Sequence, residues 1–211
     1  IFIQNKNKKW NKNGSIVIIC TELSRYMTQM HPNLLLGKRS EKYINILQRL
    51  IELITTNYSG NLIVKLSPND AERGNPIKPR VENKKYSSIK IVKNSKSLDS
   101  VLQNSRLSIH LNDGTTFLES LGNNQPSLLL IDPELYPIRK QAKPFYKELI
   151  NAGILHDSPD SANRMINKIY ENVGSWWNRD DVVLAKRKFC NQFARHSKKP
   201  LKEIRNAIIS T

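Results

Sequence analysis

The chain has 211 residues, enough for one well-packed core or two small ones. It contains 34 Lys and Arg and 18 Asp and Glu, so its formal charge is 34 − 18 = +16. Such a charge usually indicates nucleic acid or an anionic membrane as a partner. The basic residues are spread along the chain, however, so a solvated basic surface explains them as well, and the sequence has no RNA-binding aromatic motif and no zinc-finger spacing.

The first fourteen residues are polar and rich in Lys and Asn, so we predict a linker or a frayed arm there. Because the sequence begins with Ile1 and not Met, we read it as part of a longer chain, which suits one half of a two-domain enzyme. No apolar run approaches the length of a membrane span, and no signal peptide is visible. Cys20 and Cys190 are expected to be buried thiols in a reducing compartment, not a disulfide or a metal pair.

The first predicted strand is the apolar run at residues 15–20. The loop that follows, residues 21–39, is long, and loops of this length are usually functional. It carries three basic residues, Arg25, Lys38 and Arg39. Ser40 is the expected N-cap of a helix that runs to about Tyr58. One side of this helix is apolar and includes Tyr43, Ile44, Leu47, Leu50, Ile51 and Ile54.

Residues 62–66 form the second predicted strand, and residues 89–92 form a third, weaker one. The segment from Ser67 to Asp70 follows the second strand. It can contact a nucleotide base or ribose, or it can simply make a turn, which its Pro and Asn residues favour. Residues 97–104 are expected to form a short helix whose inward side chains are Leu98, Val101 and Leu102.

The stretch from Arg106 to Asp132 is read as strand, turn, helix, loop and strand. Its strands are predicted at residues 107–111 and 127–131, and the second is apolar on both faces, as a buried parallel strand should be. Asn112-Asp113-Gly114 has the composition of a tight turn. The helix is predicted at residues 115–122, where Thr116 and Glu119 have the spacing of a capping box.

Strands that alternate with helices predict an α/β fold with a Rossmann-like parallel sheet of about five strands and helices on both faces. Right-handed crossovers permit the order 3-2-1-4-5. After Pro137 only helices are predicted: residues 138–152 with a bend at Pro144, Ser158 to about Val173, Asp180 to about Phe193, and Pro200 to Ile209. We therefore divide the chain into an arm (1–14), a Rossmann-like domain (15–175) and C-terminal helices that pack on it (176–211).

The turn after residue 111 is predicted to bind a ligand. Open α/β sheets bind ligands at the carboxyl ends of their strands, and Gly114 lets the backbone approach a ligand closely. The N–H groups of Thr115, Thr116 and Phe117 are then free at a helix N-terminus, which is a ready anion site. Glu119, one turn later, can accept a hydrogen bond from a sugar hydroxyl. The alternative is that Glu119 only closes the capping box and Gly114 only makes the turn.

Residues 114–129, GTTFLESLGNNQPSLL, resemble the donor-binding segment of GT-B glycosyltransferases. In that fold a turn of small residues leads into a helix with a Glu, and a Gly and a Pro precede the next strand. The resemblance implies that Gly114, Thr115 and Thr116 contact the donor phosphates and that Glu119 holds the ribose. Many GT-B enzymes have a second Glu seven residues before the first, and here that position is Asn112.

A narrower resemblance extends over about residues 15–195. Short motifs follow one another in order: TELSR (21–25), LIVKLSP (62–68), DPELY (132–136), KPFY (143–146), AGILH (152–156), WW (176–177) and FC (189–190). In this order they resemble a family of transferases from bacterial surface-polysaccharide (O-antigen) gene clusters. The resemblance implies that Arg25 matches an Arg of that family.

Other candidates lie in the loops at the same end of the sheet. Arg25 and Lys38, with Arg39 beside it, can neutralise donor phosphate, although an exposed basic loop explains them as well. Asp132 and Glu134 can bind hydroxyls of the donor sugar or can be plain solvated loop residues. His110 ends the central strand and its ring can reach the crevice, but it has no acidic partner or second His at metal-ligand spacing.

These observations predict the donor-binding half of a glycosyltransferase that moves a sugar from a nucleotide-activated donor to a cell-surface polysaccharide acceptor. No cofactor or metal is expected, because the nucleotide sugar is the substrate. The expected partners are a glycan or lipid-linked acceptor and an N-terminal domain of the same protein, in the cytoplasm or at the inner membrane face, with peripheral contact to anionic lipid. Two alternatives stay open: a nucleotide-sugar 2-epimerase of GT-B-like fold and, with less support, a basic nucleic-acid-binding module.

Overall fold

The structure is a computed structural model that describes residues 14–23, 35, 37–58, 60–67, 77–81, 89–92, 98–195 and 199–209. Arg25 lies outside these residues. The strands are β1 (Ser15–Ile19), β2 (Leu62–Lys65), β3 (Ile89–Val92), β4 (Ser105–His110), β5 (Ser127–Leu130) and β6 (Leu155–His156). The α-helices are α1 (Lys38–Asn57), α2 (Lys78–Val81), α3 (Leu98–Gln103), α4 (Thr115–Gly122), α5 (Lys143–Asn151), α6 (Pro159–Ile169), α7 (Val173–Trp177), α8 (Asp180–Phe193) and α9 (Pro200–Ile209).

All six strands form one parallel sheet in the order β3-β2-β1-β4-β5-β6. The predicted Rossmann-like fold and the predicted order of its first five strands are therefore confirmed. The sixth strand, β6, was not predicted. It has only two residues, Leu155 and His156, which is too short for an alternating pattern to show in the sequence.

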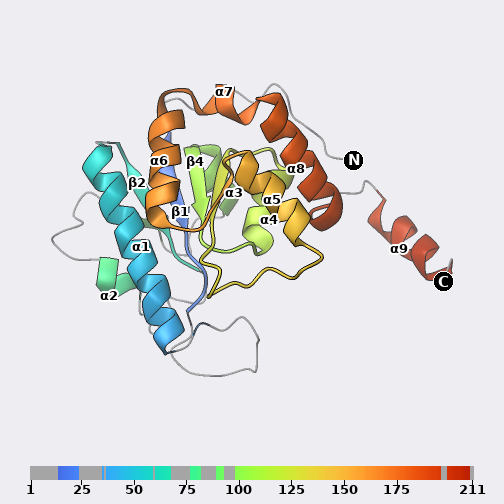
Figure 1. Ribbon diagram of the computed structural model, residues 1–211, viewed down its shortest axis with the longest axis horizontal. Helices are drawn as coiled ribbons and strands as arrows, with labels where there is room; N and C mark the ends of the chain where they lie inside the picture. The colour runs from blue at the N-terminus through green and yellow to red at the C-terminus, as the bar shows by residue number, and fades with distance from the viewer. Residues whose placement is uncertain are drawn as a thin grey trace.

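Helices cover the sheet on both sides. The six predicted inward residues of α1 are all buried, and α1 packs beside α6 (Figure 1). On the opposite face, Phe117 of α4 contacts Phe189 of α8 with their ring centroids 6.1 Å apart. A smaller apolar cluster near α3 is made by Val17, Ile19, Val92, Val101 and Leu102. Both cysteines are buried free thiols, as predicted.

Two predicted helix starts were wrong, and so was one predicted N-cap. The helix α1 begins at Lys38, so Ser40 lies inside its first turn, where its hydroxyl donates to the Gly37 carbonyl instead of capping the helix. Residues 138–142 precede α5 instead of forming its first part, and Pro144 stands in the first turn of that helix, where proline is tolerated. The helix predicted at residues 115–122 matches α4, but its N-cap is Gly114 and Thr116 is its second residue, so the predicted capping box does not form.

The C-terminal part contains α7, α8 and α9. Trp176 and Trp177 are both buried, and five residues of α8 are buried as well. In contrast, α9 lies apart from the sheet (Figure 1), and its described apolar side chains Leu201, Ile208 and Ile209 are exposed. The predicted division at residue 175 stays a prediction.

Candidate functional site

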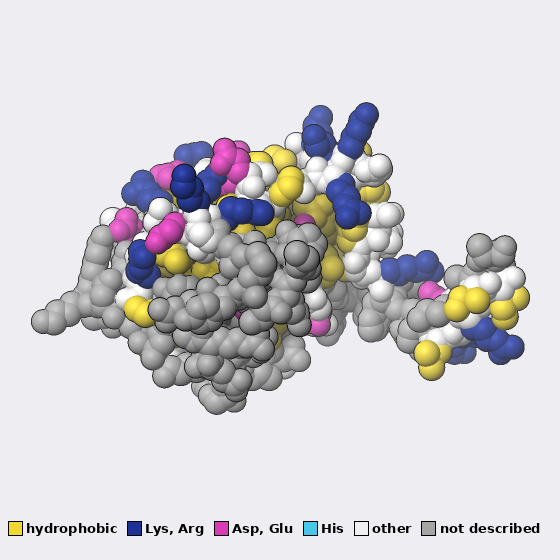
Figure 2. Space-filling view, turned by 90° about the horizontal axis from the view of Figure 1, so that it is seen from below, with side chains coloured by type: hydrophobic (Ala, Val, Ile, Leu, Met, Phe, Trp, Pro, Cys, Tyr) yellow, Lys and Arg dark blue, Asp and Glu magenta, His cyan; other side chains and the backbone are white. Residues whose placement is uncertain are grey.

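The carboxyl ends of the parallel strands meet at one edge of the sheet. Thr21 follows β1, Ser67 follows β2, and Asp132 follows β5, while the turn at residues 112–114 follows β4. The helix α1 also begins at this edge, because it follows β1. Figure 2 views the molecule from the side on which α1 begins and shows Lys and Arg side chains next to Asp and Glu side chains there. Ligands of open α/β sheets bind at this edge.

The helix α4 begins with two free backbone donors. Gly114 is its N-cap in an extended conformation, with φ −71° and ψ −172°. The Gly114 carbonyl accepts from the N–H groups of Phe117 (3.0 Å) and Leu118 (3.2 Å). The N–H groups of Thr115 and Thr116 have no partner within the described residues. Our prediction was thus wrong for the Phe117 N–H, which the first turn uses, and the remaining two donors can receive an anion.

Glu119 has no capping role. The predicted capping box needs Thr116 as N-cap, but α4 starts one residue earlier and has no side-chain cap. The Glu119 side chain is exposed and has no hydrogen-bond or ion-pair partner in the described part of the chain. Its carboxylate is therefore open to a ligand, one turn after the two free N–H groups.

Asn112 holds the turn before α4. Its side-chain Oδ1 accepts from the Gly114 N–H at 3.1 Å, and its Nδ2 donates to the Thr21 hydroxyl at 2.7 Å. A Cβ at position 114 would lie 3.1 Å from that Oδ1, so glycine makes room for the Asn112 side chain. The Thr21 N–H in turn donates to the buried Tyr43 hydroxyl at 2.9 Å. These bonds fix the β4–α4 turn against the end of β1.

Two basic residues, Lys38 and Arg39, lie near the start of α1, and one of them makes a hydrogen bond to the protein. Lys38 and Arg39 lie in the first turn of α1 and not in the preceding loop, contrary to the prediction. Lys38 is exposed. Arg39 donates to the Leu135 carbonyl. Both side chains are exposed, and Arg39 keeps further N–H donors besides the one bonded to Leu135; the phosphate-binding role of Lys38 stays a prediction, as does that of Arg25.

Asp132 and Glu134 share a lysine that the sequence did not indicate as a partner. Lys42 of α1 lies 2.9 Å from Asp132 and also bonds to Glu134, and the two carboxylates raise the pKa of Lys42. Burial raises the pKa of Asp132, but hydrogen bonds from Lys42 and from the Leu135 and Glu134 N–H groups outweigh it and lower that pKa. A donor-sugar hydroxyl would have to share the Asp132 oxygens with Lys42, whereas Glu134 is largely exposed and bonds to Lys42 through Oε2; the sugar-binding role of both stays a prediction.

The His110 ring does not reach the crevice, in agreement with the structural role expected of a lone His without a charged partner. It is fully buried, and burial lowers its pKa to about 3, so the ring is neutral at physiological pH. Its Nε2 lies 3.2 Å from the Ser108 hydroxyl. Ser67 is half-buried at the end of β2, and its ribose contact stays a prediction. No group of three His, Cys, Asp or Glu side chains that could hold a metal occurs among the described residues.

Sequence reasoning missed two tyrosines at this edge. The Tyr146 hydroxyl of α5 donates to the Asp113 carboxylate, and the Tyr136 hydroxyl is buried without a hydrogen-bond partner among the described residues. Both side chains come from segments that follow β5, so only the folded topology brings them to the β4–α4 turn. The motifs KPFY (143–146) and DPELY (132–136) had marked the two segments without indicating what they contact.

Comparison with known proteins supports the fold. The family model described as LIC12162 family transferase matches residues 1–208. No curated protein is detectably similar in sequence. Among solved structures, TarM superposes with a TM-score of 0.56 at 12% identity; the match covers 98% of this chain and 37% of TarM. The chain therefore spans well under half of TarM, and at this identity the likeness extends to the fold alone.

Two other structures overlap less closely. The spinosyn rhamnosyltransferase SpnG, complexed with spinosyn aglycone, has a TM-score of 0.43 at 14% identity, over 90% of this chain and 44% of SpnG. A Listeria monocytogenes protein described as a UDP-N-acetylglucosamine 2-epimerase has a TM-score of 0.45 at 12% identity, over 90% of this chain and 45% of that one. Neither overlap is close enough to add to the argument.

Proposed function

Because this chain belongs to the LIC12162 family of transferases, we propose that it is the donor-binding half of a GT-B glycosyltransferase. It binds a nucleotide-activated sugar at the carboxyl edge of its sheet. The sugar is then transferred to a cell-surface polysaccharide acceptor, a glycan or a lipid-linked chain, with an N-terminal domain of the same protein completing the enzyme.

One observation carries this proposal: at the start of α4 stand two N–H groups, and one turn later an exposed carboxylate, none of which has a partner among the residues that the structure describes. The N–H groups of Thr115 and Thr116 suit the negative charge of a diphosphate, and the helix dipole adds to them. The Glu119 carboxylate suits the paired hydroxyls of a ribose. A nucleoside diphosphate presents both groups, with its ribose next to its phosphates.

The chemical contribution of this half is positional and electrostatic. The donors at the start of α4 hold the diphosphate and oppose the negative charge that grows on the departing nucleotide. Lys38 and Arg25 are proposed to add positive charge at the same edge. No cofactor takes part, since the nucleotide sugar is itself the substrate. No helix in the described part of the chain is long and apolar enough to cross a membrane.

A thermal-shift panel of sugar nucleotides tests the proposal, followed by calorimetric titration of the best binder. We expect the sugar nucleotides of one nucleotide class to raise the melting temperature. The corresponding nucleoside diphosphate should also bind. If no sugar nucleotide or nucleoside diphosphate binds, the proposal is wrong. Incubation with the donor alone separates the epimerase alternative, because an epimerase forms product without an acceptor. Binding that ignores nucleotides but falls steeply with salt would instead indicate a nucleic-acid module.

A further inference from the structure

The Asp113 carboxylate is not used by the turn that contains it. In an Asn-Asp-Gly turn either acidic or amide side chain can hold the backbone. Here Asn112 does so, since its Oδ1 accepts from the Gly114 N–H and its Nδ2 bonds to Thr21. The Asp113 side chain is half-buried at the carboxyl edge and is therefore available for another purpose.

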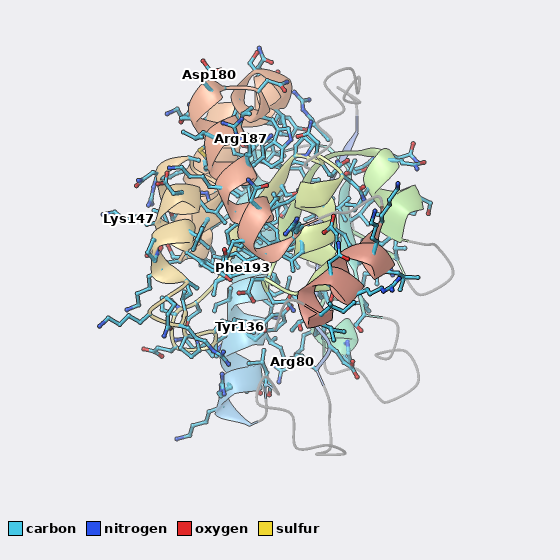
Figure 3. All side chains as sticks on the ribbon, turned by 90° about the vertical axis from the view of Figure 1, so that its right-hand side faces the viewer. Arg80, Tyr136, Lys147, Asp180, Arg187 and Phe193 are labelled. Carbon is cyan, nitrogen blue, oxygen red and sulfur yellow. The ribbon has the colours of Figure 1, made fainter. Side chains whose placement is uncertain are left out.

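Tyr146 of α5 holds this carboxylate in place. Its hydroxyl donates to Asp113 Oδ2, across 33 residues of sequence. The Tyr146 ring is packed edge-on against Phe189 and Phe193 of α8, with centroid distances of 5.2 Å and 6.1 Å. In Figure 3, Phe193 lies beside α5. Lys147, which follows Tyr146 in α5, extends away from the body of the protein. The aromatic packing fixes the hydroxyl, and through it the orientation of Asp113.

The phenol is a constant donor. Burial of the Tyr146 ring, the hydrogen bond to Asp113 and the negative charge of Asp113 all raise the pKa of Tyr146 well above its ordinary value. It therefore stays protonated through the neutral range and donates to Asp113 Oδ2. The other Asp113 oxygen, Oδ1, has no partner in the part of the chain that the structure describes. One oxygen is anchored and the other is open.

The position of this open oxygen limits what it can bind. Asp113 is two residues from Thr115, so their Cα atoms are at most about 7.6 Å apart. A carboxylate this close to an anion site repels a bare phosphate. It favours a ligand only if that ligand carries hydrogen-bond donors beside its phosphate, as a sugar diphosphate does with its hydroxyls. Asp132 is a weaker candidate for the same task, because it already accepts from Lys42 and from the Glu134 and Leu135 N–H groups.

We propose that Asp113 accepts a hydrogen bond from a hydroxyl of the donor sugar and makes the site select sugar diphosphates over free nucleoside diphosphates. Tyr146 is the positioning residue that aims the carboxylate. This inference rests on the proposed function and adds to it the part of the donor that Asp113 recognises. If the Tyr146–Asp113 contact only joined α5 to the β4–α4 turn, the site would have no such selectivity.

The test compares two ligands on the full chain. Calorimetric titration uses whichever of UDP-glucose, UDP-N-acetylglucosamine, GDP-mannose and dTDP-rhamnose binds best, and the matching free UDP, GDP or dTDP. Asp113→Asn should weaken the sugar nucleotide about tenfold to a hundredfold, the loss expected for a charged hydrogen bond. The same variant should bind the free nucleoside diphosphate as well as the parent or better, since a repelling charge is gone. Tyr146→Phe should weaken only the sugar nucleotide, about threefold to tenfold.

Tyr58→Phe is the matched control, because the Tyr58 hydroxyl donates to Asn167 at the far end of α1. It should leave both affinities unchanged. Equal losses for both ligands in Asp113→Asn, or no loss for either, would overturn the inference while leaving nucleotide binding in place. A lowered melting temperature in Tyr146→Phe with both affinities intact would also overturn it and reduce the contact to a structural tie. If the parent binds neither ligand, the proposed function fails first and this inference falls with it.

Discussion

The surroundings of Lys186 and the start of α4 differ in whether their polar groups have hydrogen-bond partners. Lys186 is fully buried, yet its ammonium donates to Asn124 Oδ1 at 3.0 Å and to the Trp177 carbonyl at 2.9 Å, and it lies 3.7 Å from the centre of the Trp177 ring. The N–H groups of Thr115 and Thr116, at the carboxyl edge of the sheet, have no partner in the described part of the chain. The fold satisfies its polar groups where they join helices and leaves them unsatisfied where a ligand can complete them.

The Lys186 cluster joins three parts of the chain. Asn124 lies between α4 and β5 in a left-handed conformation with φ +53°, which Asn adopts more readily than most residues. Its Oδ1 also accepts from the Trp177 indole at 2.9 Å. The cluster therefore connects the end of α4 with α7 and α8. Mutations there should act on stability, whereas mutations at the start of α4 should act on binding.

The largest expected effect is a loss of stability in Lys186→Ala. The change removes two hydrogen bonds and leaves a cavity beside Trp177, so the free energy of unfolding should fall by about 2–5 kcal/mol. Lys186→Met keeps the volume of the stem and should recover most of this loss. Denaturant unfolding measures both. Lys188→Ala is the control, because Lys188 is half-exposed in an ion pair with Glu148 and should cost less than about 1 kcal/mol. Equal losses in Lys186→Ala and Lys188→Ala would contradict the prediction.

The next effect is a dependence of stability on pH. Burial lowers the pKa of Lys186 from 10.5 to about 7, so between these values the unfolded chain binds a proton that the folded chain does not. Stability should therefore rise with pH from about 7, by as much as about 1.4 kcal/mol per unit. Above pH 9 the buried Cys190 thiol, whose pKa is raised to about 12, acts in the opposite direction. The window for measurement is thus pH 7–9, where Lys186→Met should abolish the rise. A rise that persists in this variant would have another source.

Glu119→Gln should have a comparable effect on binding and none on folding. Gln keeps the shape but removes the charge of the acceptor, and a charged hydrogen bond is worth about 1.5–3 kcal/mol. Nucleoside diphosphate affinity should then fall about tenfold to a hundredfold, as calorimetric titration would show. The melting temperature should not change, since Glu119 caps nothing in α4. Intact affinity with a lowered melting temperature would make Glu119 a structural residue and remove the main support for the proposed site.

The sequence predicted the sheet because its strands are apolar runs separated by helices with one apolar side. The six inward residues of α1 are an example, and the order of the first five strands followed from general handedness. Helix starts were less predictable. Thr116 and Glu119 have capping-box spacing, but the N-cap is Gly114, two residues before Thr116, and the Asn112 side chain holds the turn in place of a Thr116 cap.

The contacts that define the site could not be read from the sequence. Lys42 and Asp132 are 90 residues apart in sequence, and Tyr146 and Asp113 are 33 apart. The first pair forms only because α1 packs at the carboxyl edge, and the second only because α5 does. Lys186 did leave a trace: it interrupts the apolar side of α8, four residues after Val182 and three before Phe189. A lysine in that position indicates a buried cation with partners.

The smallest expected effect distinguishes the contribution of the Thr115 N–H to nucleotide binding from that of the Thr115 hydroxyl. Thr115 is the first residue of α4, a position that accepts proline, and α6 in this chain already begins with Pro159. Gly114 is extended, as the residue before a proline should be. Thr115→Pro should therefore remove one N–H without breaking the helix, while Thr115→Ala removes only the hydroxyl.

If the N–H binds phosphate, the proline variant should bind the nucleoside diphosphate about tenfold more weakly than the alanine variant, at similar melting temperatures. Thr56→Ala, which removes an exposed hydroxyl bonded within α1, should leave affinity unchanged. Equal binding by the proline and alanine variants would mean that the Thr115 N–H holds no phosphate, and the contrast between the open start of α4 and the satisfied Lys186 cluster would then have no functional meaning at that residue.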